Sequence, residues 1–339
     1  TIFLRDRLEY NSLIDRYDNL FNYFKDFENN IDEKSLINHE YKNQLAVING
    51  YLNGNKIKEA TDYLKEIINS GENFIVNDTK EEYYKTFMPT LKENGYKTYL
   101  INYKDALNSN GFNPLIVPYK LYKSGNKDLA IDEINNIANE LFKNDEAMDP
   151  FWQNSASDYF KGLTLLLFEI GKEEEINLGS VGMMLLQAEN NKETFDKFKE
   201  YIKSLEFTNP IYIFLSGTVF APVETRGGIV SVLKIELNKY ISKENLLNLL
   251  CQNELDLNNL KEKTAIFVIG NENTNRLTNI LIDQLYNSNN NFNYIIDNID
   301  SLISINSLNG LLETSKINNN RIIIGTRNIK ELSNKNKFN

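Results

Sequence analysis

Cysteine and histidine are almost absent from this sequence of 339 residues. The one cysteine, Cys251, has no partner for an internal disulfide, which indicates a reducing compartment. The one histidine, His39, excludes zinc sites that need Cys/His pairs. Apolar runs such as 162–168 and 265–269 fall far short of the roughly 20 residues that cross a bilayer. We therefore expect no membrane span and a cytoplasmic location.

Positive charge is also in short supply. The sequence has 37 Lys and Arg against 47 Asp and Glu, a formal net charge of -10. This balance repels a phosphate backbone and excludes a nucleic-acid surface that extends over the whole chain, so any contact with DNA is expected to be weak and local. The 41% of hydrophobic residues is ample for cores, which indicates a globular protein.

The first 70 residues contain no proline, and their glycines are at 50 and 54. Apolar residues recur there at helical spacing, at Ile14, Tyr17, Phe21, Phe24, Tyr41, Leu45, Ile48 and Leu52. The turn at 53–55 interrupts this pattern, and a second helix follows with Ala60, Leu64, Ile67 and Ile68. The pattern predicts an N-terminal α-helical hairpin over 1–70.

Beyond residue 70, short β-type runs alternate with helical stretches. The runs lie at 73–76, 97–101, 211–215, 265–269, 294–296 and 321–324. A helix expected at 81–94, with Pro89 inside it, would join the first two runs into a parallel βαβ unit. Residues 131–205 are expected to be mainly helical. The sequence thus predicts an α/β fold with a parallel sheet in two parts, 71–125 and 259–339, around a mainly helical insertion at 126–258.

Several segments after residue 70 form an ordered set of motifs. They are Phe74-Ile-Val-Asn-Asp-Thr-Lys-Glu-Glu82, Gly95-Tyr96, Phe112-Asn-Pro-Leu115, Asp149-Pro-Phe-Trp152, Glu224-Thr-Arg-Gly-Gly-Ile229 and Lys263-Thr-Ala-Ile-Phe-Val-Ile269. In this order they resemble the motor domain of TraG/TraD-type coupling proteins of conjugative type IV secretion, over about 71–335.

This resemblance implies a RecA-like sheet with a helical insertion. It also implies a hexamer that uses ATP and magnesium to drive DNA or protein into a secretion channel. Other transfer-machinery proteins would be its partners. A homo-oligomer through the hairpin or through the RecA-like domain remains open. An upstream anchor or a partner would place the chain at the inner face of the plasma membrane.

The resemblance also suggests nucleotide-binding candidates, at Asp78, Lys80, Asp297, Arg226 and Arg327. Asp78 and Lys80 stand in a turn that reads Asp-Pro-Lys-Gly-Glu in the family. Asp297 would orient magnesium, but Asn298 follows it where the family has glutamate, and an amide cannot act as a base. For the two arginines, a finger toward a neighbouring nucleotide and an ordinary surface position are both open, as is a purely structural role for each acidic strand end.

A phosphate-binding loop is missing from the motif set. No Gly-Lys-Ser or Gly-Lys-Thr occurs in the sequence, although such a loop needs glycines, a lysine and a hydroxyl to hold phosphates and magnesium. We therefore expect no ATP hydrolysis by the chain itself, while ATP and magnesium stay open as ligands.

Residues 20–68 carry a second resemblance. The stretch 36–45, with His39, Glu40 and Asn43, resembles the phosphoacceptor box of AgrC-like sensor histidine kinases. His39 and Asn43 share the helix face opposite the apolar stripe, so His39 would face solvent, and Glu40 would orient its ring or take its proton. A solvated histidine on a polar helix face is the alternative. No kinase domain follows, so His39 would have to be phosphorylated by another protein.

Three functions remain open on the sequence alone. The first is a degenerate coupling-protein-like component of conjugative transfer machinery. The second is a phosphorelay or dimerisation module with His39 as phosphoacceptor. The third is a structural interaction protein, or a fragment rejoined near residue 70.

Overall fold

The computed structural model describes residues 56–144, 149–260, 263–288, 291–296, 302 and 322–324. The chain divides into two compact units, Thr1–Asn55 and Lys56–Asn339, and every described residue belongs to the second. Helix α3 (Lys56–Ser70) is the expected second helix of the N-terminal region. The first helix of the predicted hairpin, with His39, Glu40 and Asn43, lies outside the described residues.

A five-stranded parallel sheet forms the centre of the α/β part, as predicted. Its strands are β1 (Phe74–Asn77), β2 (Lys97–Asn102), β3 (Thr264–Ile269), β4 (Asn293–Ile296) and β5 (Ile322–Ile324), in the spatial order β2-β3-β1-β4-β5. Strands β1 and β2 are parallel, with α4 (Glu82–Glu93) between them in sequence, but they are not neighbours. Strand β3, which follows the insertion, lies between them.

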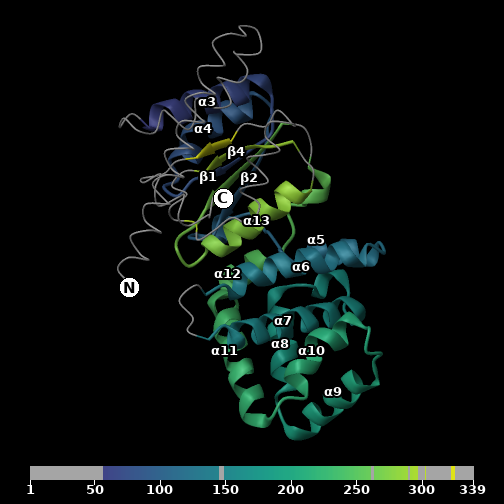
Figure 1. Cartoon of the computed structure of the whole chain (residues 1–339). Coiled ribbons are helices and arrows are strands. Elements are labelled where there is room, and N and C mark those ends of the chain that lie inside the picture. Colours follow the sequence, from purple (N-terminus) through teal and green to yellow (C-terminus); the bar gives the residue numbers. More distant parts are fainter. Residues whose placement is uncertain are drawn as a thin grey trace, which may run out of the picture. The chain divides into compact units, whose positions relative to one another are not determined.

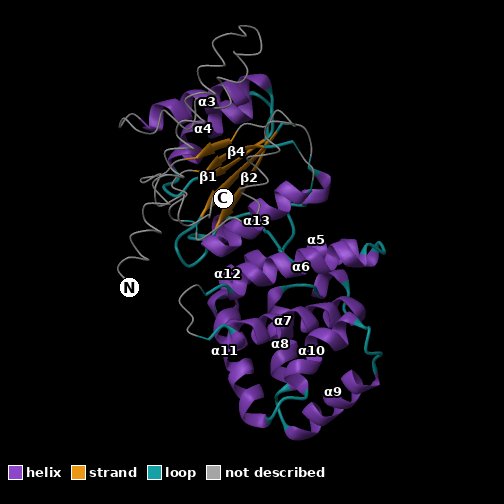
Figure 2. Cartoon of the chain, in the orientation of Figure 1, coloured by secondary structure: helices purple, strands orange, loops and turns teal. Residues whose placement is uncertain are grey.

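The two faces of the sheet pack against different helices, as Figures 1 and 2 show. On one face Phe267 of β3 meets Tyr84 of α4 at a ring-centroid distance of 5.4 Å and Phe74 of β1 at 5.9 Å. On the other face Ile75 and Ile266 join a buried cluster that continues through α13 (Asn275–Asn287) into the insertion. Alternate strand residues therefore serve two cores, which is why these strands are apolar throughout.

Helices fill the predicted insertion. They are α5 (Ile116–Lys123), α6 (Lys127–Phe142), α7 (Phe151–Ile170), α8 (Leu178–Ala188), α9 (Lys192–Ser204), α10 (Pro210–Val219), α11 (Val223–Ile241) and α12 (Glu244–Cys251). A short 3-10 turn at Glu173–Glu175 connects α7 and α8, and two more, at Ala106–Asn108 and Leu257–Asn259, lie between the sheet strands and the insertion helices. Among the described residues, no helix combines the length and the apolar character that a membrane crossing needs.

The predicted extended run at 211–215 is wrong, because these residues lie inside α10. Pro210 occupies the first turn, where its missing N–H costs nothing, and the Asn209 side chain accepts from the Ile211 N–H at 2.8 Å. The buried positions Ile211, Leu215 and Val219 follow helical spacing. A short uncharged run fits a strand or a helix equally well, and the Asn-Pro start decides for the helix.

The segment between β2 and α5 and the segment that follows α12 connect the sheet to the insertion, and they bind each other. The Gly111 N–H and the Asn110 amide both donate to the Glu254 carboxylate, at 2.7 and 3.2 Å. The backbone adds bonds from Leu255 N to Gly111 O and from Phe112 N to Leu249 O, each at 3.1 Å. A Cβ on Gly111 would lie 2.3 Å from the Gln252 Cβ, so the close approach requires glycine.

Candidate functional site

The carboxyl ends of the parallel strands define the candidate site. The connection that leaves β1 leads to β2 on one side, whereas the connection that leaves β4 leads to β5 on the other. Such a reversal between neighbouring strands is where open parallel sheets bind ligands. Asp78 follows β1 at this edge, Asn102 ends β2, and Gly270 follows β3.

The structure places Asp78 fully buried at the start of α4. Its two carboxylate oxygens accept the N–H groups of Glu82 at 3.0 Å and of Tyr84 at 2.8 Å. Its own N–H donates to the Val268 carbonyl at 2.8 Å. The first N–H groups of a helix can donate either to a capping carboxylate or to a bound anion, so a carboxylate bonded to them takes the place of the anion. Asp78 therefore stabilises the turn and withdraws these amides from phosphate binding.

Glu81, in the same turn, has a φ of 61°, in the left-handed region that favours glycine. It stands where the coupling-protein pattern described above has glycine. The backbone thus keeps the shape that the family's glycine allows, and the side chain strains it.

Lysine side chains reach this edge from two strand ends. Lys80, the sequence candidate, is exposed. Lys104, which the sequence reasoning missed, donates from Nζ to the Thr79 carbonyl at 2.6 Å. The Asn102 side chain holds the turn that follows β2, because it accepts the N–H groups of Lys104 and Asp105 at 3.1 and 3.0 Å. The polar residues directly after β2 were the signal that could have identified Lys104.

The loop after β3 leads directly into α13. The Asn271 N–H donates to the Thr274 hydroxyl at 2.9 Å, and the Thr274 N–H donates to the Asn271 carbonyl at 2.8 Å. A Cβ on Gly270 would lie 3.1 Å from the Thr274 Oγ1. These contacts place the first turn of α13, with Arg276, beside the end of the sheet.

Arg226 is not at the sheet edge. It lies in α11, inside the insertion, where its Nε is 3.4 Å from Glu189 and its guanidinium is 3.6 Å from the centre of the Phe195 ring. Its side chain is 17% exposed, so it does not lie freely on the surface, which was one of the two positions that the sequence left open. Glu189 also accepts the Tyr159 hydroxyl at 3.1 Å. Arg226 thus ties together the helices of the insertion.

Two of the motifs found in the sequence bind parts of the fold together. Asn113 donates to the Ile176 carbonyl at 2.6 Å and accepts the Leu115 N–H at 3.0 Å, and the Pro114 carbonyl accepts from Gln284 of α13 at 2.7 Å. Trp152, from the Asp-Pro-Phe-Trp motif, packs on the buried cluster. These residues therefore have structural contacts.

Asp297 and Arg327 lie outside the described residues, so their positions as nucleotide ligands stay predictions. Within the described part of the chain, no cluster of three or more His, Cys, Asp or Glu residues is arranged to hold a metal. The magnesium role of Asp297 is therefore carried by the sequence pattern alone.

The fold and its sheet edge define a RecA-like coupling-protein domain. Residues 63–301 match the family model for type IV secretory system conjugative DNA transfer, and the chain belongs to that family. The match begins at residue 63 and so does not reach the kinase-like box around His39. A comparison with curated proteins gives no match.

Two solved structures have a similar fold. Plasmid coupling protein TrwB in complex with the ATP analogue ADPNP is 14% identical, with a TM-score of 0.51 over 80% of this chain and 61% of that one. Bacterial conjugative coupling protein TrwBdeltaN70, in an unbound form, is 11% identical, with a TM-score of 0.51 over 82% and 61%. The chain thus spans about three fifths of these proteins' length. At such identities the likeness establishes the fold alone.

Proposed function

We propose that this chain is a coupling-protein-like component of conjugative DNA transfer machinery that does not hydrolyse ATP by itself. The observation that carries the proposal is the position of Asp78, whose carboxylate occupies the first amides of α4 at the switch point of the sheet. Those amides are the groups that an anion would use at this turn. The absence of Gly-Lys-Ser and Gly-Lys-Thr from the sequence supports the same conclusion.

Nucleotide binding without turnover is part of the proposal. Asp297 would orient magnesium beyond β4, and the exposed Lys80 would approach the phosphates. Asn298 leaves the attacking water without a base. A bound nucleotide would then act as a signal for the insertion.

We propose that partners from the transfer machinery bind the insertion. Its surface carries an exposed aromatic group: Phe207, 81% exposed, and Phe220, 38% exposed, both lie beside the Tyr212 ring, at centroid distances of 5.5 and 6.2 Å. Exposed apolar groups that lie close together commonly mark contact surfaces between proteins. The net charge of -10 favours protein partners over extended contact with DNA.

The test is equilibrium binding of a fluorescent ATP analogue with magnesium, alongside steady-state phosphate release. We expect micromolar binding by the intact chain, loss of binding in Asp297→Ala, and phosphate release no higher than that of a denatured control. Asp105→Asn is the matched control, since Asp105 is an exposed carboxylate close to the same edge. Phosphate release above the denatured control would contradict the proposal.

The phosphoacceptor function of His39 stays a prediction of the sequence. Its test is transfer of labelled phosphate from a sensor kinase to the chain and loss of that label in His39→Ala. The observations at the sheet edge favour the coupling-protein function.

A further inference from the structure

Arg276 joins the α/β part to the insertion through three acceptors. From the first turn of α13 its Nη1 donates to the Leu141 carbonyl and lies 3.3 Å from the Glu236 carboxylate, and its Nη2 donates to the Lys143 carbonyl at 2.6 Å. Leu141 and Lys143 lie in the last turn of α6 and at its cap, where carbonyls lack helical partners. Glu236 lies on α11. One guanidinium therefore holds two insertion helices to the sheet side.

Burial makes this contact strong and directional. The side chains of Arg276 and Glu236 are each 17% exposed. A partly buried, forked guanidinium that is hydrogen bonded to carbonyls and a carboxylate is costly to disrupt, because each group left behind loses a partner. Lys239 shares Glu236 at 2.6 Å, so the carboxylate stays paired if Arg276 moves away.

The α13 contact also contains polar pairs beside its apolar side chains. Asn279 donates to Glu140 at 3.0 Å, and Asn287 donates to Glu133 at 2.7 Å. Burial raises the pKa of the Glu133 carboxyl, and the hydrogen bond from Asn287 opposes that rise. Polar groups regain hydration when a seam opens, so separation here costs less than for an apolar seam of equal area.

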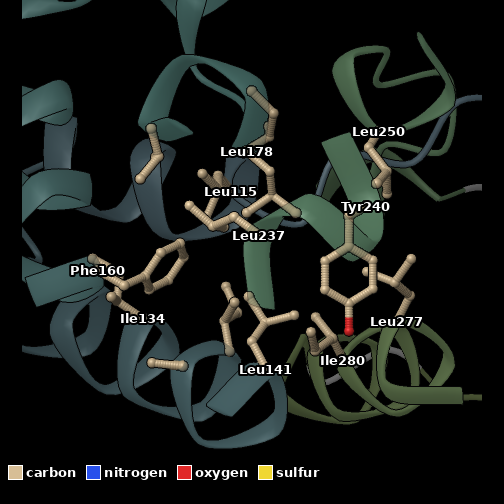
Figure 3. Packing of buried hydrophobic residues seen from close by; sticks show 14 of the residues in the cluster. Leu115, Ile134, Leu141, Phe160, Leu178, Leu237, Tyr240, Leu250, Leu277 and Ile280 are labelled. Carbon is tan, nitrogen blue, oxygen red and sulfur yellow. The ribbon is translucent and has the colours of Figure 1, made fainter. Parts of the chain in front are cut away.

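Tyr240 lies at the centre of this seam. Figure 3 shows its ring extending from α11 toward Leu277 and Ile280 of α13. Within the described residues its hydroxyl, like that of Tyr103 after β2, is buried without a hydrogen-bond partner. The packed arrangement therefore leaves polar groups unsatisfied, which lowers its advantage over a more open one.

We propose that Arg276 is a clamp that couples the edge of the sheet to the helical insertion. The Gly111–Glu254 crossing is the pivot, and release of the Arg276 clamp lets the insertion move about it. The loop 270–274 joins the end of β3 directly to the first turn of α13, so a shift at the sheet edge displaces Arg276. The movement of the insertion on release of Arg276 is inferred from these contacts. That a bound nucleotide causes the release rests on the proposed function.

The test measures the distance between the two parts in the full chain. Spin labels are attached at Lys92→Cys of α4 and Lys197→Cys of α9, in a Cys251→Ser background that removes the exposed native thiol. We expect a narrow distance distribution for the parent and a broad or two-peaked one for Arg276→Ala. Arg276→Lys, which retains the charge without the fork, should lie between them.

Arg226→Ala is the matched control. Arg226 also pairs with a glutamate, and its side chain is equally 17% exposed, but its contacts stay within the insertion. It should lower stability while leaving the distance distribution narrow. If Arg276→Ala fails to fold, Glu236→Gln weakens the same clamp with little change in volume. Equal distributions for the parent, the Arg276 variant and Glu236→Gln would overturn the proposal, as would equal broadening by Arg226→Ala.

Addition of the magnesium–ATP analogue separates the two proposals. If the analogue binds and shifts the distances in the parent but not in Arg276→Ala, the clamp transmits the signal. If it binds and shifts both equally, coupling through Arg276 is wrong. If it does not bind, the proposed nucleotide site fails, and the measurements without ligand still decide whether Arg276 holds the two parts together.

Discussion

The indole ring of Trp152 lies directly against Gly228, so that two motifs far apart in the sequence meet between α7 and α11. A Cβ built on Gly228 would lie 2.5 Å from Cζ3 of the ring and 3.0 Å from Cη2. The neighbouring Gly227 has open space at the same position, with nothing within 4 Å. The Glu-Thr-Arg-Gly-Gly-Ile segment thus needs its second glycine for packing, while the first has room for a side chain.

Gly228→Ala is therefore expected to destabilise the chain relative to Gly227→Ala by about 1–3 kcal/mol, the usual cost of overpacking a filled contact. Gly227→Ala should be stabilising by about 0.5–1 kcal/mol, because alanine restricts the unfolded chain and favours the helix. Urea unfolding of both variants measures the difference. Equal stabilities would mean that the Trp152 ring moves aside without cost.

Glu81→Gly is expected to stabilise the turn before α4. The left-handed φ of 61° costs a side chain about 1 kcal/mol, which glycine avoids. The exposed ion pair with Lys85, at 2.9 Å, adds little that would be lost. Glu82→Gly, one residue further and inside the helix, should instead destabilise by a similar amount. Thermal unfolding of the two variants should show opposite shifts in Tm, and a fall for Glu81→Gly would show that the turn is not strained.

Asp78→Asn tests the structural role of that carboxylate. The amide can accept only one of the two N–H groups that Asp78 binds, so we expect a loss of about 1 kcal/mol in the free energy of unfolding. Affinity for the magnesium–ATP analogue should not fall, because the carboxylate faces the backbone of α4. A large loss of affinity with unchanged stability would instead assign Asp78 to the ligand.

Tyr96 predicts a specific response to alkaline pH. Its hydroxyl donates to the Glu72 carbonyl at 2.8 Å, just beyond the end of α3, and burial followed by the Glu72 charge raises its pKa to about 12. In the unfolded chain the hydroxyl titrates near 10. Between these values the unfolded chain loses a proton that the folded chain keeps, so stability falls as the pH rises from 10 to 12.

Comparison with Tyr96→Phe isolates this residue from the other buried tyrosines, which are present in both proteins. Below pH 10 the parent should be the more stable by about 1 kcal/mol, the net value of one hydrogen bond. This difference should shrink between pH 10 and 12. Urea unfolding over that range measures it, and a constant difference would contradict the assigned pKa.

Much of the fold could be predicted from local patterns. The apolar runs that became β1, β2, β3, β4 and β5 were recognisable because a parallel sheet buries both faces of its strands. The helices expected at 131–205 were recognisable because their apolar residues recur at helical spacing. The run at 211–215 misled because its uncharged residues fit either period, and the cap at Asn209 was the better signal.

For the candidate site, the sequence predicted the positions of residues along the chain but not the directions of their side chains. The sequence placed Asp78 at a strand end, since strand ends can be found from the pattern of apolar residues. It did not give the direction of the Asp78 carboxylate, which depends on where the amides of α4 lie. Arg226 was grouped with the nucleotide candidates because of its motif, and packing assigned it to Glu189 and Phe195 instead.

The sequence by itself determined the class of fold, the order of its elements apart from the run at 211–215, and the absence of a Gly-Lys-Ser or Gly-Lys-Thr motif. These properties reside in composition and in spacing along the chain. Only the tertiary structure decided that β3 lies between β1 and β2, that Trp152 covers Gly228, and that Arg276 reaches the end of α6. Each of these joins residues far apart in sequence, and such contacts depend on how whole elements pack, which no local pattern records.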